Sequence, residues 1–166
     1  QTAKAIALLS AFAGADPDAL VALGNAYQLS GKTAEAVKTY QRLLEADPKN
    51  GVAHMNLGII RLEARDVNGA EGELRQALDL DPGLASAYTA LGVVFMQKNS
   101  PGDAVEAWKR AVALDPTEFN AMFNLIDVLS RAGQMDAARP YAEQFINTAP
   151  PQLAREVEAV RRLIGR

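Results

Sequence analysis

The chain has 166 residues, of which 49% are hydrophobic and 22% are charged, and its formal net charge at pH 7 is −3. This length suits one ordinary domain with a continuous apolar core, and the composition is typical of a soluble folded protein. The slight negative charge gives no electrostatic reason to expect nucleic acid, because phosphate binding needs a concentrated basic face. The absence of cysteine excludes disulfides, thiolate zinc sites and thiol nucleophiles, and it does not choose between cytoplasm and periplasm.

Four prolines divide the chain at a fixed interval. Pro48, Pro82, Pro116 and Pro150 are each 34 residues apart (82−48, 116−82, 150−116), and three of them follow aspartate. Aspartate followed by proline is a natural helix stop and turn. Each interval holds two patterns of helical period and no alternating strand pattern. The sequence therefore predicts an all-α chain built from repeated helix–turn–helix units.

The amino-terminal segment predicts a helix that belongs to this repeat. Its sequence AIALLSAFA, after a lysine, is compatible with a short signal peptide. However, AIALLSAFAGADPD aligns with AVKTYQRLLEADPK by the shared ADP, which places Leu9 under Tyr40. We therefore interpret 1–16 as the second helix of a preceding repeat whose first helix is missing, and we expect the native protein to extend upstream of Gln1.

Residues 17–50 form the first full repeat. Apolar or small residues recur at helical spacing along its first half, namely Leu20, Leu23, Gly24 and Tyr27. Gly31 ends that helix, and Thr33 is expected to cap a second one, TAEAVKTYQRLLEA. Each helix has about 13 residues and so spans roughly 20 Å. Because helices this short are marginal alone, their stability has to come from packing on neighbours.

The intervals 51–84, 85–118 and 119–151 repeat the pattern. In the second repeat the same slots hold His54, Leu57, Gly58, Ala70, Leu74 and Pro82, with Arg61 in place of Tyr27. The third repeat has Tyr88, Leu91, Gly92, Phe95, Ala104, Trp108 and Pro116. The fourth has Met122, Leu125, Leu129, Ala138 and Pro150. Here Ile126 replaces the glycine of the small slot, which predicts a wider helix pair.

Residues 152–166 predict one more amphipathic helix. One stripe along PPQLAREVEAVRRLI is apolar, with Leu153, Val157, Val160 and Ile164. On the remaining face Arg155, Arg161 and Arg162 alternate with Glu156 and Glu158, which favours a solvated surface over an anion site. Such a helix commonly shields the exposed end of a repeat array, so we expect it to act as a cap.

This pattern resembles the tetratricopeptide repeat family, whose 34-residue unit reads W-x2-L-G-x2-Y, then A-x3-F, then P. The resemblance covers nearly all of the chain and is closest in 85–118. It implies a right-handed α-solenoid of helix–turn–helix repeats with a carboxy-terminal capping helix. It also implies that carboxylates on the second helices, such as Glu71 and Glu73, point to solvent.

In this family the first helix of each pair lines a concave groove, whose side chains are identified by rotation from the core side. The predicted peptide-binding groove consists of Asn25, Gln28, Met55, Asn56, Ile59, Thr89, Val93, Phe123, Asn124, Asp127 and Arg131. Side-chain amides can hydrogen-bond the backbone of an extended peptide, and methionine or branched side chains can accept its apolar residues. The alternative is that the apolar members only support the neighbouring first helices.

Little in the sequence points to catalysis. His54 is the only histidine, and it occupies a slot that Leu20 and Tyr88 fill in other repeats, which favours a packed side chain over a metal ligand. The chain contains no phosphate-cradling glycine loop and no motif that sets a nucleophile beside a base. We therefore predict no catalytic residue, no metal site and no cofactor.

Three hypotheses on function remain. The first is a non-catalytic protein–protein interaction scaffold that binds a peptide or protein segment in the groove, without nucleic acid or membrane insertion. The second is a carboxy-terminal module of a larger bacterial enzyme, because FINTAPPQLAREVEAVRRLI faintly resembles the tetratricopeptide tails of some bacterial sulfatases. The third is self-association to a homo-oligomer through the amino-terminal helix, whose Ile6, Leu9 and Phe12 lack their natural cover.

Overall fold

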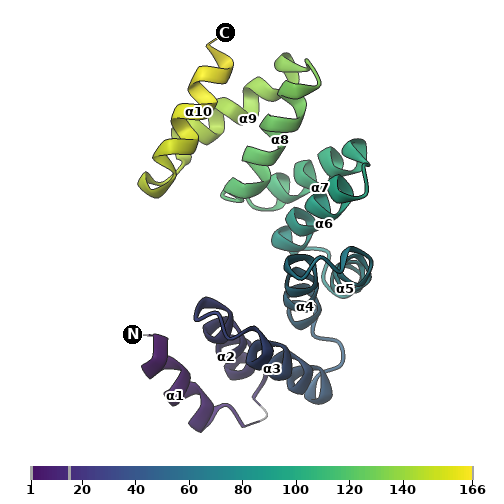
Figure 1. Ribbon diagram of the computed structural model, residues 1–166, viewed down its shortest axis with the longest axis vertical. Coiled ribbons are helices and arrows are strands. Elements are labelled where there is room, and N and C mark those ends of the chain that lie inside the picture. Colours follow the sequence, from purple (N-terminus) through teal and green to yellow (C-terminus); the bar gives the residue numbers. More distant parts are fainter. Residues whose placement is uncertain (1, 15, 166) are drawn as a thin grey trace. The chain divides into compact units, whose positions relative to one another are not determined.

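The computed structural model describes residues 2–14 and 16–165. Within these ranges the chain forms ten α-helices and one short 3-10 helix, and it contains no strand (Figure 1). The helices belong to two compact units, Gln1–Pro82 and Gly83–Arg166. The predicted fold class, an all-α chain of short paired helices, is confirmed.

The first unit contains five helices. They are α1 (Thr2–Phe12), α2 (Pro17–Leu29), α3 (Thr33–Ala46), α4 (Gly51–Glu63) and α5 (Val67–Leu80). Helices α2 and α3 pack as one pair, and α4 and α5 pack as the next. The core of the first pair includes Leu20, Leu23 and Leu43, which are all at most 3% exposed.

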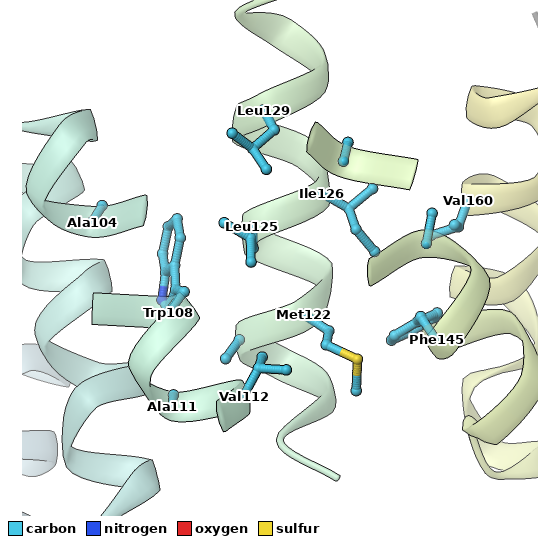
Figure 2. Packing of buried hydrophobic residues seen from close by; sticks show 13 residues of the cluster. Ala104, Trp108, Ala111, Val112, Met122, Leu125, Ile126, Leu129, Phe145 and Val160 are labelled. Atoms are coloured by element: carbon cyan, nitrogen blue, oxygen red, sulfur yellow. The ribbon is translucent and has the colours of Figure 1, made fainter. Parts of the chain in front are cut away.

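The second unit contains the other five helices. They are α6 (Ala85–Gln97), α7 (Pro101–Leu114), α8 (Phe119–Arg131), α9 (Met135–Thr148) and α10 (Ala154–Ile164), with a 3-10 turn at Pro151–Leu153 before α10. Helices α6 and α7 form a pair, as do α8 and α9, and α10 packs on both α8 and α9. Because Val160 of α10 is buried in the same cluster as Trp108 and Phe145, α10 is part of the core of this unit (Figure 2).

The turn inside each helix pair has one backbone conformation. A residue with positive φ recurs every 34 positions: Gly31 at 71°, Arg65 at 66°, Asn99 at 58° and Gly133 at 73°. After α2, the Lys32 amide donates to the Tyr27 carbonyl and the Gly31 amide to the Gln28 carbonyl, both at 2.9 Å. This double closure is a Schellman motif, which ends a helix with a left-handed residue. Glycine adopts that conformation without strain, whereas Arg65 and Asn99 do not.

The cap expected from Thr33 is wrong. Lys32 occupies the N-cap of α3 without a side-chain capping bond, and Thr33 is the first helical residue. The reason is that the Schellman closure already ends at Lys32, so the next helix starts directly after it. At the same place in the second repeat, Asp66 does cap α5, and its carboxylate accepts from the Gly69 amide at 3.0 Å. That hydrogen bond and the neighbouring Arg61 hold the pKa of Asp66 below its usual value.

Small and large residues face each other inside the pairs. The glycine of the small slot faces the residue 16 positions later: Gly24 faces Tyr40 (40−24), Gly58 faces Leu74 (74−58) and Gly92 faces Trp108 (108−92). A Cβ added at Gly92 would lie 2.2 Å from Nε1 of Trp108, so only glycine fits there. In the fourth pair the same two positions hold Ile126 and Ala142, both buried in one cluster. The bulky residue has therefore moved from the second helix of the pair to the first.

Candidate functional site

The two predicted residues on α2 are tied to the core of their own pair. The hydroxyl of Tyr40 lies 2.6 Å from both Asn25 Oδ1 and Gln28 Oε1. A hydroxyl carries one hydrogen, so it donates to one amide and accepts from the NH₂ group of the other once that amide is flipped. Burial raises the pKa of Tyr40 far above its ordinary value, which keeps this donor protonated. Only the amide groups that Tyr40 does not use remain for a ligand.

The three predicted residues on α4 differ in accessibility. Met55 and Ile59 are half-buried, and they stand four positions apart on one face of the helix. Asn56 is only 8% exposed, and its Nδ2 donates to the Val52 carbonyl at 3.0 Å. The structure therefore leaves Met55 and Ile59 partly open and commits much of Asn56 to its own helix.

A polar network lies beside this face, between α4 and α5. His54 is buried as predicted, at 8% exposure, and its Nδ1 lies 2.8 Å from Glu73 Oε2. The Nη2 of Arg61 lies 3.3 Å from Glu73 Oε1, and its Nη1 lies 3.0 Å from Asp66 Oδ2.

The expectation that Glu71 and Glu73 point to solvent is therefore wrong, since their side chains are only 15% and 18% exposed. For Glu73 the cause lies on α4. His54 and Arg61 stand where other repeats have apolar or aromatic residues, and these two polar groups draw the carboxylate inward. The sequence contained this signal, because positions 54 and 61 are seven residues apart and so share a helix face. We assign the network a structural role.

On α6, Thr89 and Val93 are both half-buried. The Oγ1 of Thr89 lies 3.2 Å from the Ala85 carbonyl and 3.0 Å from Glu118 Oε2, and the carbonyl of Thr89 accepts from Trp108 Nε1 at 3.1 Å. Thr89 thus ties α6 to α7 and to the residue that precedes α8. Sequence reasoning missed Glu118, which links the two predicted first helices of the second unit.

The four predicted residues on α8 lie along its partly exposed side. Phe123, Asn124 and Asp127 are half-buried, and Arg131 is exposed. The ring of Phe123 packs on Phe145 with centroids 6.0 Å apart. Asp127 Oδ1 accepts from Arg131 Nε at 2.9 Å, so these two side chains form an ion pair within the helix.

Two adjoining hollows lie between α8 and α10, and we call them together the α8–α10 cleft. The larger, about 470 Å³, is lined by Ser130, Arg131, Met135, Ala159, Arg162 and Leu163. The smaller, about 110 Å³, is lined by Phe123, Ile126, Asp127, Ala159, Val160 and Leu163. Three of the predicted groove residues, Phe123, Asp127 and Arg131, therefore line the cleft. The contributions of α10 were missed, because that helix was interpreted only as a cover.

The surface of α10 continues outward from the cleft. A further hollow of about 500 Å³ is lined by Ala154, Arg155, Glu158, Ala159 and Arg162. Ala159 thus borders all three hollows, and its small side chain leaves the entrance open. Two arginines of α10, Arg155 and Arg162, line this hollow, and the charged side chains around the three hollows form the rim of the cleft.

The apolar side chains of the amino-terminal helix are better covered than the sequence predicted. Ile6 and Leu9 are half-buried against the cluster that contains Ala13 and Leu20, while the side chain of Phe12 lies outside the described residues. Among the side chains of α1 that the structure describes, the large apolar one that stays exposed is Leu8, at 62%. Within that part of α1, a self-association surface would depend on Leu8.

Neither a cluster of metal-binding side chains nor a membrane-spanning helix occurs among residues 2–14 and 16–165. No group of three histidine, cysteine, aspartate or glutamate side chains in these ranges has a geometry that could hold a metal ion. Among the helices described there, none combines the length and the apolar character needed to cross a membrane.

Comparisons with known proteins agree with the helix pairs. A family model described as "Tetratricopeptide repeat" matches residues 1–51, 21–85 and 89–154. No curated protein matches the sequence of the chain. Among solved structures, PilF of Pseudomonas aeruginosa is similar with a TM-score of 0.72 and 22% identity, over 91% of this chain and 72% of that one. MamA is similar with a TM-score of 0.67 and 21% identity, over 88% of this chain and 85% of that one. At such identities both show the fold alone.

A third similar structure is that of an enzyme. A mutant O-GlcNAc transferase of Thermobaculum terrenum matches with a TM-score of 0.69 and 26% identity, over 78% of this chain and only 26% of that chain. The likeness is thus confined to about a quarter of the transferase.

Proposed function

Because the chain belongs to the tetratricopeptide repeat family, we propose that it is a non-catalytic scaffold that binds a peptide or protein segment on the first helices of its repeats. Its fold class is an all-α solenoid of helix–turn–helix repeats, and such repeats present extended surfaces to protein partners. Within the second unit, we assign the binding to the α8–α10 cleft.

One observation carries this assignment. Phe123, Asp127 and Arg131 of α8, which the family resemblance predicts on the groove side, line the two hollows of the cleft. The floor is apolar and the margin is charged, which is the usual composition of a site that takes an apolar side chain and orients it by polar groups. An amphipathic segment fits such a site.

The remaining predicted residues contribute less to this proposal. Asn25 and Gln28 already bond Tyr40, and Asn56 and Thr89 bond their own or neighbouring backbone. The general hydrogen-bonding role first expected of the amides is therefore assigned here to Asn124, which is half-buried and follows Phe123 in the sequence of α8.

The test uses peptides selected from a random displayed library on the whole chain. Ala159→Tyr places a ring in the cleft, because Ala159 is exposed and lines both hollows. We expect the affinity of the selected peptides to fall by about tenfold or more, which corresponds to ~1.4 kcal/mol. Ala137→Tyr is the matched control, since Ala137 is also exposed, lies on the neighbouring helix α9, and lines neither hollow.

Two results would contradict the proposal. One is that no peptide is enriched on the chain, and the other is that enriched peptides bind the Ala159→Tyr and Ala137→Tyr chains equally well. Melting curves followed by circular dichroism show whether each variant keeps its helices.

One observation favours a second candidate function, a module of a larger enzyme that contributes assembly or substrate positioning. The transferase described above contains a similar structure within a chain several times longer, of which the match covers 26%. This candidate requires a catalytic domain in the same open reading frame. The same requirement holds for the hypothesis of a sulfatase-like enzyme, which came from the sequence at the end of the chain. A full-length reading frame that holds only repeats would exclude it.

A further inference from the structure

We propose that the α8–α10 cleft selects a segment in which two carboxylates bracket one bulky apolar side chain. This inference rests on the proposed function and names the chemistry of the partner. In the bound segment, the apolar side chain enters the smaller hollow over Ala159, and the two carboxylates reach Arg155 and Arg162.

The balance of charge at the cleft is positive, although the whole chain carries −3. Of the two acidic side chains on the rim, Asp127 accepts from Arg131 at 2.9 Å and Glu158 accepts from Arg161 at 2.7 Å. Both acids are therefore already matched by an arginine of their own helix. Two rim cations, at positions 155 and 162, have no ion-pair partner anywhere in the described ranges 2–14 and 16–165. They are available to an anionic ligand.

The order of side chains on α10 places a gap between two cations. Arg155, Ala159 and Arg162 stand at spacings of four and three residues (159−155, 162−159), which puts them on one face of the helix. All three border the same hollow. A partner segment that lies along this face therefore contacts Arg155 first, then the open space over Ala159, and then Arg162.

The separation of the two arginines sets the spacing of the carboxylates. Seven residues (162−155) correspond to about 10.5 Å along a helix axis. An extended peptide advances about 3.3 Å per residue, so two acids about three residues apart match this distance. A single terminal carboxylate would have to draw both guanidinium groups together, whereas two acids at this spacing meet each one separately. The spacing thus favours an internal segment over a carboxy-terminal tail.

The smaller hollow supplies the apolar part of the selection. Its walls include Phe123, Ile126, Val160 and Leu163, and its volume is about 110 Å³. Burying an apolar side chain against these walls is favourable in proportion to the area removed from water. Each guanidinium can hold a carboxylate through two parallel hydrogen bonds, which adds orientation to the attraction.

A second copy of this chain is a poorer occupant. Leu8 is the large exposed apolar side chain in the described part of α1, but the helix TAKAIALLSAF contains a lysine and no acid. Such a segment would bring a positive charge to a positive rim. Charge complementarity therefore favours an acidic partner of different sequence.

The experiment measures the selected peptides on charge variants of the whole chain. Arg155→Gln and Arg162→Gln each remove one rim cation, and both residues are exposed, so the fold should persist. We expect each change to weaken binding about two- to fivefold, the range of exposed ion pairs, and the double variant about tenfold. Arg139→Gln is the control, because this exposed residue on α9 lines no part of the cleft and its loss changes the net charge equally.

The peptides provide a second arm. We expect enrichment of two acids about three residues apart around a leucine, isoleucine, methionine or phenylalanine. Replacing either acid by glutamine should weaken binding to the wild-type chain and have little further effect on the double arginine variant. Added salt should weaken binding as well.

The outcomes separate the inference from the proposed function. If the selected peptides lack acids, or if the two arginine variants bind as the Arg139→Gln chain does, the inference is overturned. If Ala159→Tyr still weakens binding by about tenfold or more in that case, the cleft remains the binding site. If Ala159→Tyr has no effect, both the site and the inference fail.

Discussion

The two helix pairs of the second unit, α6/α7 and α8/α9, differ in which helix carries the large residue at the contact between the two helices. In the first, Gly92 makes room for Trp108, which is 2% exposed and bonds the Thr89 carbonyl through Nε1. In the second, Ile126 takes the place of the glycine, and the residue that corresponds to the tryptophan is Ala142. The pair α8/α9 therefore exchanges the large and the small residue between its helices.

The exchange has a consequence for the binding surface. Ile126 stands on α8 and points toward Val160 and Phe145, whereas Leu125 points toward Trp108 (Figure 2). Ile126 is also part of the wall of the smaller hollow. A branched side chain at this position thus gives α8 an apolar flank on which α10 packs and beside which the hollow remains. The fourth repeat, in which Ile126 replaces the glycine of the motif, is therefore the repeat that forms the cleft.

The largest expected effect concerns the pair α6/α7. Trp108→Ala should destabilise the fold by about 3–5 kcal/mol, because it empties the space that Gly92 leaves for the indole. Urea unfolding followed by circular dichroism measures this loss. Ala142→Gly removes the corresponding residue of the pair α8/α9 and should cost only ~1 kcal/mol. Similar losses in the two variants would mean that the indole of Trp108 contributes no more packing energy than the methyl group of Ala142, which would contradict this account of the two pairs.

A slightly smaller loss is expected for Ile126→Ala, about 2–5 kcal/mol from the lost contacts and the cavity. The same change should weaken the selected peptides, since it removes part of the hollow's wall, whereas Leu91→Ala should cost comparable stability and leave the peptides unaffected. Leu91 is 5% exposed and lies on α6, away from the cleft. Peptide affinity that follows stability in both variants would show that the effect is not local.

A double-mutant cycle tests the exchange itself. Gly92→Ile should be severely destabilising, because even a Cβ would lie 2.2 Å from the indole nitrogen of Trp108. Combined with Trp108→Ala, the same change reproduces the arrangement of the fourth pair. We expect the double variant to be more stable than the sum of the single losses by about 0.5–3 kcal/mol. Additive losses would show that the two positions do not share one space.

The turns of the two pairs differ as well. Gly133 at φ 73° and Asn99 at φ 58° occupy the same left-handed position. Gly133→Ala should cost ~1–2 kcal/mol, whereas Asn99→Gly should stabilise by less than ~1 kcal/mol. Thermal melts of both variants provide the measurement. A stabilising Gly133→Ala would contradict the assigned backbone conformation.

The smallest effect lies at the end of α7. Hydrogen bonds from the Thr117 hydroxyl and backbone amide lower the pKa of Asp115 from its usual 3.8, whereas α9 ends at Ala149, which has no such group. A lowered folded pKa means that the stabilisation is present above the unfolded pKa and is lost as the pH falls through the folded one. Thr117→Ala should therefore raise the pKa of Asp115 toward 3.8, as measured by NMR titration, and reduce the loss of stability below that pH. An unchanged titration curve of Asp115 would show that the Thr117 hydroxyl is not the cause of its lowered pKa.

The repeat pattern predicted the helices and much of the core from the sequence. The reason is physical: short helices must bury a regular stripe, so the 34-residue spacing of Leu91, Leu125 and their equivalents fixes which sides face inward. The inward Glu73 was missed because its orientation depends on His54 and Arg61 of another helix. The wider pair expected from Ile126 stays a prediction, and its counterpart 16 positions later (142−126) is Ala142, a small residue that leaves room for it.

The candidate site was predicted only in part. Phe123, Asp127 and Arg131 followed from rotation about α8, because one helix face is a local property. The other wall, with Ala159 and Arg162, depends on how α10 docks on α8. That contact is set by tertiary packing of Val160 and its neighbours, which no repeat motif describes.

Photo-crosslinking tests most directly whether a partner segment lies between α8 and α10. A selected peptide would carry a photoreactive group in place of its apolar side chain, and mass spectrometry would locate the attachment on the wild-type chain. We predict attachment within Phe119–Arg131 and Ala154–Ile164, centred on Phe123, Ala159 and Leu163. Attachment confined to α7 or α9, the second helices of the two pairs, would contradict it.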